Sequence, residues 1–232
     1  MTLAELYDQL AYGELSQHSI GKNGSIADKD KPRIIHSLNA ALTKLYAYFP
    51  IREREVILEQ FEHITQYRLN SLYALSNTES TEMYKWVRDS VALPFLDDIV
   101  RIERIYDETG NRVPLNNEFE PNSVFTSGWD TIQVPFPNEN VTLFIMYRAK
   151  HEKFTVDTPE ETEIYLPPVL TDALQAFIAS KAFVALGNAQ SAALATFYKN
   201  KFSEEIAYVE RENLLNSSEG ESNTGLEQKG FM

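Results

Sequence analysis

The chain has 232 residues, of which 43% are hydrophobic and 12% aromatic, which is enough for one large domain or for a core with a smaller insertion. Its 21 basic and 34 acidic residues give a formal net charge of −13, and this balance lacks the basic patch of a nucleic-acid-binding protein. The absence of cysteine excludes disulfides, thiolate zinc sites, iron–sulfur clusters and cysteine nucleophiles.

Two amphipathic helices are predicted in the first fifty residues. Thr2 and Glu5 have the spacing of a capping box, in which each side chain bonds the backbone amide of the other residue. Gly13 is expected to end this helix, and Pro32 suits the first turn of a second helix that ends before Pro50. The predicted buried positions are Leu3, Leu6, Tyr7 and Leu10, then Ile35, Leu38, Leu42, Leu45 and Phe49.

From Arg52 onward the hydrophobic pattern is that of β-strands. Two short strands joined by a turn at 61–63 are followed by an ambiguous segment, 71–94, expected to be a loop with one helical turn at 83–88. The last strand is apolar on both faces around Phe144 and Met146, which is typical of a central strand. The predicted strands are 52–60, 65–70, 99–106, a short return through Val113, one or more within 123–136, and one within 139–151.

The spacing of the turns favours an antiparallel meander over βαβ units, because no segment of helical period separates the strands. Local signals do not distinguish a meander from a Greek key, so the strand order stays open.

After Pro168 the helical period returns and predicts two more helices, separated by a cap at Gly187–Asn188. Their predicted apolar faces are Leu170, Leu174, Phe177 and Ile178, then Leu194, Phe197, Tyr198, Phe202, Ile206 and Val209.

These elements predict an α+β fold in which N- and C-terminal helices form a bundle of about four helices, with an antiparallel β-region inserted centrally in the chain. The predicted divisions are N-terminal bundle helices at 1–50, an inserted β-rich region at 51–166, C-terminal bundle helices at 167–215 and a flexible tail at 216–232. The tail is rich in Ser, Gly, Asn and Glu and cannot order itself alone.

No catalytic motif is present, so the sequence favours a protein that is not an enzyme and has no catalytic residue, cofactor or metal site. His18, His36, His63 and His151 are scattered without the i, i+4 spacing of a helical metal site. The carboxylate groups and the pair His151–Glu152 are expected to be exposed, and Trp86 and Trp129 to be core or interface aromatics. The carboxylate groups considered are Asp97–Asp98, Glu160–Glu161 with Glu163, and Glu204–Glu205.

Four segments together resemble head-to-tail adaptor (connector) proteins of tailed bacteriophages, particularly the short-tailed ones. The resemblance is one of pattern, covers most of the chain up to about residue 210 and contains no chemical signature. The segments are 3–21 (LAELYDQLAYGELSQHSIG), 34–58 (IIHSLNAALTKLYAYFPIREREVIL), 94–117 (PFLDDIVRIERIYDETGNRVPLNN) and 164–183 (IYLPPVLTDALQAFIASKAF).

This resemblance implies a structural virion protein at the head–tail interface, assembled as a homo-oligomeric ring of about twelve copies under the portal protein. Such a ring extends the channel through which genomic DNA passes, and it offers a platform to the tail or nozzle protein. The C-terminal segment often reaches the portal in this family, so Leu226, Phe231 and Met232 are the implied portal-interface residues. A frayed terminus is the alternative for this segment.

Two other functions stay open at this stage. One is a tail-completion or nozzle protein of the same machinery, and the other is a small hydrolase or carbohydrate-binding protein that uses the β-region. The N-terminal stretch lacks an apolar signal core and no apolar run is long enough to span a membrane. We therefore expect a soluble protein made in the host cytoplasm, without membrane contact.

Overall fold

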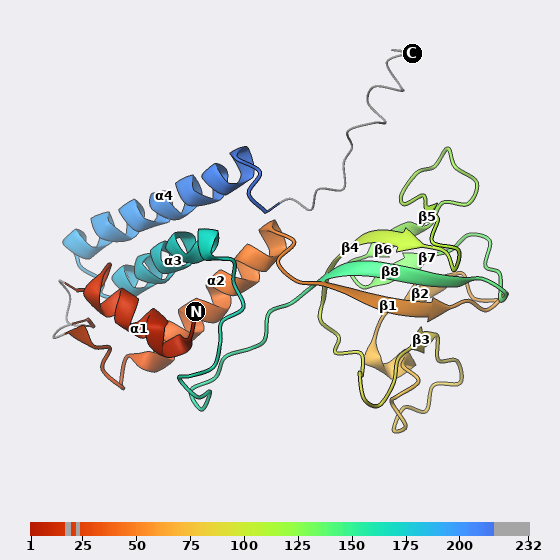
Figure 1. Cartoon of the computed structure of the whole chain (residues 1–232), viewed down its shortest axis with the longest axis horizontal. Coiled ribbons are helices and arrows are strands. Elements are labelled where there is room, and N and C mark those ends of the chain that lie inside the picture. The colour runs from red at the N-terminus through yellow and green to blue at the C-terminus, as the bar shows by residue number, and fades with distance from the viewer. Residues whose placement is uncertain (17–19, 22–23, 216–232) are drawn as a thin grey trace, which may run out of the picture. The chain divides into compact units, whose positions relative to one another are not determined.

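The computed structural model of the chain describes residues 1–16, 20–21 and 24–215. Its fold is α+β, as the sequence predicts: two helices precede the strands, the strands form antiparallel sheets, and two helices follow them (Figure 1). The chain divides into two compact units, Met1–Tyr165 and a second that begins at Leu166. The tail predicted for 216–232 lies outside the described residues.

The helix α1 (Leu3–Tyr12) begins with the predicted capping box. The amide of Glu5 donates to the Thr2 hydroxyl over 3.2 Å, and the amide of Thr2 donates to the Glu5 carboxylate over 2.9 Å. The helix ends at the predicted Gly13, whose amide donates to the carbonyl of Gln9 over 2.8 Å. All four residues predicted to be buried on this helix, Leu3, Leu6, Tyr7 and Leu10, are buried.

The helix α2 (Lys31–Tyr48) has Pro32 in its first turn, where the missing amide hydrogen costs no helical hydrogen bond. Its predicted buried face is confirmed, and Phe49 caps its C-terminal end. Tyr46 is also buried, on the side of the helix that carries the site described below.

The first unit contains two antiparallel sheets. The five-stranded sheet has the order β3-β1-β8-β4-β5 and the three-stranded sheet the order β2-β7-β6. Their strands are β1 (Glu53–Glu59), β2 (Gln66–Arg68), β3 (Val87–Arg88), β4 (Ile99–Tyr106), β5 (Arg112–Val113), β6 (Phe125–Gly128), β7 (Thr131–Gln133) and β8 (Thr142–Ala149). The predicted central position of the last strand is confirmed, because β8 pairs with β1 on one side and with β4 on the other.

The first two predicted strands belong to different sheets, because β1 joins the large sheet and β2 the small one. Two details of the predicted β-region are wrong. The large sheet is not a meander, since β8 lies between β1 and β4. The helical turn expected at 83–88 is absent: Val87 is fully buried and pairs with Leu58, so the chain is extended there, and the short 3₁₀ helix η2 lies earlier, at Ser71–Tyr73.

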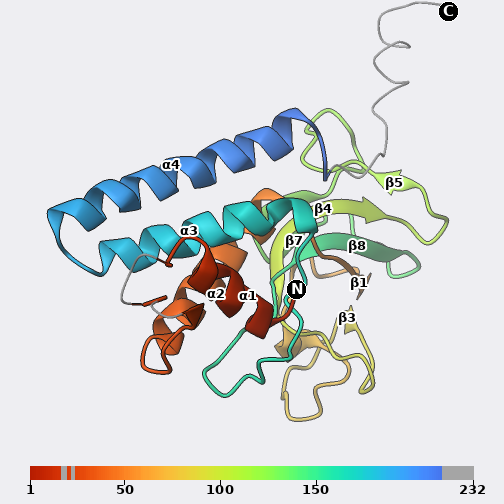
Figure 2. The ribbon, with the colours of Figure 1, turned by 60° about the vertical axis from the view of Figure 1, so that its left-hand side comes forward.

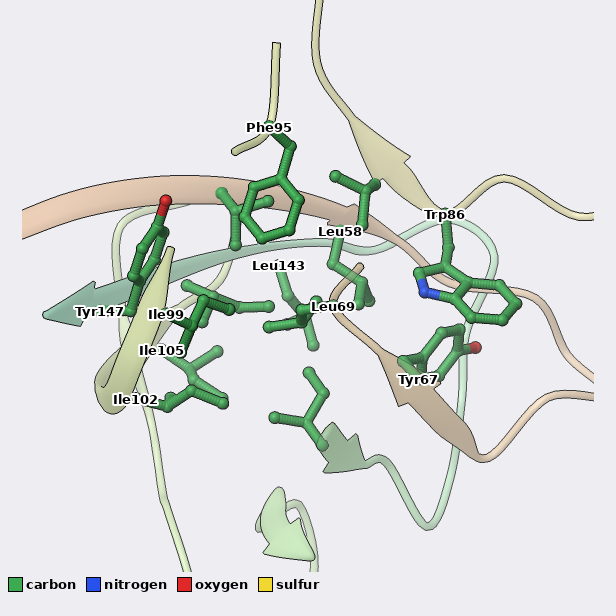
Figure 3. Close-up of a cluster of buried hydrophobic side chains, with 14 of the residues drawn as sticks. Leu58, Tyr67, Leu69, Trp86, Phe95, Ile99, Ile102, Ile105, Leu143 and Tyr147 are labelled. Carbon is green, nitrogen blue, oxygen red and sulfur yellow. The ribbon is translucent and has the colours of Figure 1, made fainter. Parts of the chain in front are cut away.

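A hydrophobic core fills the space beside these strands (Figure 3). Trp86 and Tyr67 meet edge to face, with ring centroids 5.6 Å apart, and the Trp86 indole donates to the carbonyl of Arg68 over 2.8 Å. The buried indole is therefore satisfied, and the prediction of Trp86 as a core aromatic is confirmed. Residues from six strands, β1, β2, β3, β4, β7 and β8, converge in this core, so both sheets share it.

The second unit is a helical hairpin after the short 3₁₀ helix η3 (Pro168–Leu170), with α3 (Thr171–Val184) beside α4 (Ala189–Arg211) (Figure 2). Gly187 takes the left-handed conformation, at φ +69°, and Asn188 caps α4 by accepting from the amide of Ser191, as the predicted cap requires. The rings of Phe177 and Phe202 pack edge to face, with centroids 5.2 Å apart.

Two predictions for these helices need correction. Burial on α3 extends beyond the predicted stripe to small residues such as Ala173 and Ala179 on its other sides. Phe197, which the sequence places on the buried face of α4, is 60% exposed, whereas Phe202 and Tyr198 face α3, where they meet Phe177 and Phe183.

Candidate functional site

A pocket in the first unit lies where α2 meets the ends of β4 and β8, and we call it the α2 pocket. Its volume is about 590 Å³, within the usual range for ligand and partner sites. It is lined by Asn39, Thr43, Tyr46 and Ala47 of α2, Ile99 and Val100 of β4, Trp129 of the β6–β7 turn, and Lys150, His151 and Lys153 after β8.

Hydrogen bonds tie the segment after β8 to α2 and so form one wall of the α2 pocket. The Asn39 amide donates to the carbonyl of Phe154 over 2.8 Å and accepts from its amide over 3.0 Å. One turn along the helix, the Thr43 hydroxyl lies 3.1 Å from Nε2 of His151. The ring of Tyr46 meets the imidazole edge to face, with centroids 5.7 Å apart.

The protonation of His151 follows from these partners. Its Nδ1 lies 2.7 Å from the carbonyl oxygen of Glu152, which can only accept, so we assign the ring proton to Nδ1. Nε2 is then an acceptor that faces the Thr43 hydroxyl. Burial lowers the pKa of His151 below its usual range, which favours this neutral form at pH 7.

The Thr43–His151 pair has the atoms of a hydroxyl nucleophile and its base, but its setting is poor for catalysis. Thr43 lies inside α2, where the neighbouring backbone amides are used in helical hydrogen bonds and cannot form an oxyanion hole. The Thr43 hydroxyl also lies 2.8 Å from the carbonyl of Asn39, which competes for its proton. The arrangement is better suited to holding the wall of the pocket than to activating a nucleophile.

The charged groups at the α2 pocket are all basic. Lys150 places its ammonium 5.2 Å from the ring centroid of Trp129, and both Lys150 and Lys153 are exposed. None of the lining residues, which all belong to the described part of the chain, is acidic. The nearby Glu152 belongs to a separate cavity and pairs with Arg52 over 3.3 Å. In a chain of net charge −13, this pocket is a local positive site with an apolar and aromatic lining.

A smaller cavity of about 270 Å³ shares Tyr46 and His151 with the α2 pocket. The Tyr46 hydroxyl donates to the carbonyl of Tyr165 over 2.6 Å, and burial raises the pKa of Tyr46 to about 12. Tyr46 is therefore protonated at neutral pH and acts as a hydrogen-bond donor between α2 and the end of the first unit.

The carboxylates considered in the sequence do not converge on one site. Asp97 accepts from the amide and hydroxyl of Ser71, whereas its neighbour Asp98 accepts from Arg54 and Tyr147, so the adjacent pair serves different partners. Of the other groups, Glu160 pairs with Lys31 over 2.8 Å, Glu161, Glu163 and Glu204 are exposed, and Glu205 is partly exposed on α4.

The remaining predicted site residues have different positions. Trp129 is 56% exposed at the rim of the α2 pocket and is not part of the core. The three portal-interface residues implied by the resemblance, Leu226, Phe231 and Met232, lie outside the described residues, as does His18. Within the described ranges, no three His, Asp or Glu side chains gather closely enough to hold a metal ion.

Sequence reasoning missed the α2 pocket because its parts are far apart along the chain. Thr43 and His151 are separated by 108 residues, and no local pattern connects them. One signal was available: two lysines flank His151–Glu152 directly after a central strand, in a chain dominated by acidic residues.

The comparisons with known proteins do not identify a family for this chain. Neither the protein-family models nor the curated proteins contain a match to it. None of the helices in the described part of the chain is both long and apolar enough to span a membrane.

Proposed function

We propose that this chain is a structural virion protein, a head-to-tail adaptor that assembles as a ring between the portal and the tail of a bacteriophage. In this role it extends the DNA channel, binds the portal protein on one side and the tail or nozzle protein on the other, and catalyses no reaction. The proposal is supported by the resemblance of four segments to such adaptors and by the surface described next.

The observation that supports this proposal most is the number of large apolar side chains that the first unit leaves exposed. Val91 is 82% exposed and Leu93 80% exposed in the loop between β3 and β4, and Met83 is 84% exposed just before β3. Large apolar side chains that a folded unit leaves exposed are candidates for a surface that a partner covers. Further exposed apolar residues of this region are Leu72, Leu75 and Leu96. A subunit with several contact partners explains such a surface better than an isolated enzyme does.

The acidic balance suits a conduit for DNA. A charge of −13 on each subunit accumulates when copies form a ring, and a negative channel wall repels DNA phosphates. The genome then passes without sequence-specific binding. The same repulsion weakens self-association, so we expect the portal to promote ring formation.

A hydrolase is the second candidate, because the Thr43–His151 hydrogen bond borders a pocket. The lack of an oxyanion hole at Thr43 and the absence of an acidic group in the pocket lining disfavour it. Replacement of Thr43 by valine should leave any hydrolytic activity of the preparation unchanged if the hydroxyl has only a structural role.

The test of the proposed function is binding to each neighbour in the tail machinery. The purified chain should form a stable complex with the portal protein encoded in the same genome, measured by sedimentation or light scattering. Binding to the nozzle protein without binding to the portal would instead identify a tail-completion or nozzle protein. Binding to neither would contradict both.

A further inference from the structure

A loop at the edge of the large sheet presents an aromatic side chain to solvent. It comprises residues 114–124, between β5 and β6, and we call it the Phe119 loop. Phe119 is 97% exposed, the highest value among the large apolar residues described, so it packs against almost nothing within the described part of the chain. Glu118 and Glu120 flank it and are also exposed. The tip of this loop is therefore an aromatic group between two carboxylates.

The Phe119 loop is held in shape by its own hydrogen bonds. At its base, the amide of Val124 donates to the carbonyl of Pro114 over 2.9 Å. The buried hydroxyl of Ser123 accepts from the amide of Asn117 over 3.0 Å, and the Asn117 side chain accepts from the amide of Phe119 over 3.1 Å. A loop ordered in this way presents Phe119 with little loss of conformational entropy on binding.

The α2 pocket has the complementary properties. Its lining is mainly aliphatic and aromatic, with Ile99, Val100, Tyr46 and Trp129, and its charged groups are lysines. A volume of about 590 Å³ accommodates an aromatic side chain together with adjacent loop atoms. Lys150 and Lys153 lie at the exposed side of the pocket, where they can pair with carboxylates on either side of an inserted ring.

We infer that the Phe119 loop of one copy inserts into the α2 pocket of the next copy. Phe119 occupies the apolar pocket beside Trp129, and Glu118 and Glu120 pair with Lys150 and Lys153. This inference rests on the proposed function, because it supplies the contact between subunits of the ring. The occupant is a second copy because this chain itself carries the acidic aromatic element that matches the pocket in charge and chemistry.

The two elements belong to different surfaces of the same unit, so the contact is heterologous. The pocket includes Ile99 and Val100 at the start of β4, whereas the Phe119 loop follows β5, which pairs with Ile105 and Tyr106 at the end of that strand. Each copy then uses its loop on one neighbour and its pocket on the other. Repetition of such a contact gives a ring if the rotation closes.

Disulfide trapping tests the contact directly, because the chain contains no cysteine. Glu120→Cys and Lys153→Cys, made in separate full-length chains and mixed under mild oxidation, should give a cross-linked dimer. Glu120→Cys mixed with Glu79→Cys, which is exposed on the loop before β3, is the matched control. Cross-linking no stronger than in this control would overturn the inference.

Charge reversal adds a test that is independent of folding defects. At concentrations high enough for the native chain to associate without the portal, the loop variant Glu118→Lys with Glu120→Lys and the pocket variant Lys150→Glu with Lys153→Glu should each lose self-association. Their equal mixture should regain it, because opposite charges meet again at every contact. Phe119→Ala should weaken association by about tenfold or more, the scale of an aromatic anchor. Failure of the mixture to recover would overturn the inference.

The outcomes separate this inference from the proposed function. Cross-linking and recovery without binding to the portal would support the contact and contradict the adaptor role. Portal-bound rings that are unaffected by both reversed variants would support the adaptor role and contradict the contact. Binding of the portal in the α2 pocket, with no cross-link between the Phe119 loop and the pocket, would also contradict it.

Discussion

The side chain of Asn39 and the backbone of Phe154 form two hydrogen bonds, 2.8 Å and 3.0 Å long, between residues 115 positions apart. The side-chain amide of Asn39 thus forms the two backbone hydrogen bonds that a neighbouring strand would form with Phe154, which lies beyond the end of β8. The backbone of Phe154 both donates and accepts, and so does the side-chain amide of asparagine. The two hydrogen bonds therefore fix the distance between α2 and the segment after β8, which forms one wall of the α2 pocket.

Replacement of Asn39 by aspartate should destabilise the protein, because a second oxygen then faces the carbonyl of Phe154 where a donor stood. We expect the free energy of unfolding to fall by about 1–3 kcal/mol, the cost of leaving a buried polar group without its partner. Urea denaturation measures this change in the free energy of unfolding. Asn200→Asp, at an exposed position of α4, is the control and should change stability little. Equal effects of the two substitutions would contradict the role of Asn39.

His151 should make stability depend on pH. Burial lowers its pKa in the folded protein, so the unfolded state binds more protons as the pH falls through about 6.5, the usual value for histidine. The stability that comes from burying neutral His151 is fully present above pH 6.5 and is lost progressively as the pH falls below it. The charged groups that line the two cavities around His151 are Arg52, Lys150, Lys153, Glu152 and Glu163.

The melting temperature between pH 7.5 and 5.5 measures this effect. It should fall in the native chain and fall less in His151→Asn, which cannot titrate but can still bond to Thr43. His63→Asn, at an exposed position, serves as the control and should follow the native chain. If His151→Asn shows the same pH dependence as the native chain, the account of His151 is wrong.

Two phenylalanines on α4 should differ in their contribution to stability. Phe202 is buried and meets Phe177 edge to face, whereas Phe197 is 60% exposed. Phe202→Ala should cost about 3–5 kcal/mol, the usual range for a large-to-small change in a core. Phe197→Ala should cost much less, and guanidinium denaturation compares them. Similar losses of stability in the two variants would mean that Phe197 is buried, as the sequence predicts, and would contradict its exposed position in the structure.

Much of the fold could be predicted because the signals are local. The capping box at Thr2 and Glu5, the cap at Asn188 and the apolar stripe of α2 involve residues within a few turns of each other. The central position of β8 was also predictable, because a strand between two others inside a packed unit is apolar on both faces.

The pairing of strands could not be predicted in this way. β1 pairs with β8 from Glu53–Arg148 to Glu59–Thr142, and no local pattern specifies a partner so distant in the chain. Val87 was placed in a helical turn because two strand residues are too few to show a period. The α2 pocket could not be predicted either, because its lining comes from segments far apart in the chain: α2, β4, the β6–β7 turn and the segment after β8.

Deletion of residues 216–232 tests the portal-docking role proposed for Leu226, Phe231 and Met232. The truncated chain should keep the circular dichroism spectrum and melting temperature of the native chain, but should lose binding to the portal. Triple alanine replacement at these three positions should have the same effect, whereas Glu219→Ala should not. Undiminished portal binding by the truncated chain would remove this segment from the interface.

The central claim is that copies of this chain form a ring on the portal, and the mass and symmetry of the complex test it most directly. Electron microscopy and light scattering of the chain mixed with its portal protein give both quantities. The account predicts a closed ring of identical subunits around a central channel, stacked on the portal. A portal that stays bare, or one that carries isolated copies of the chain without ring closure, would contradict it.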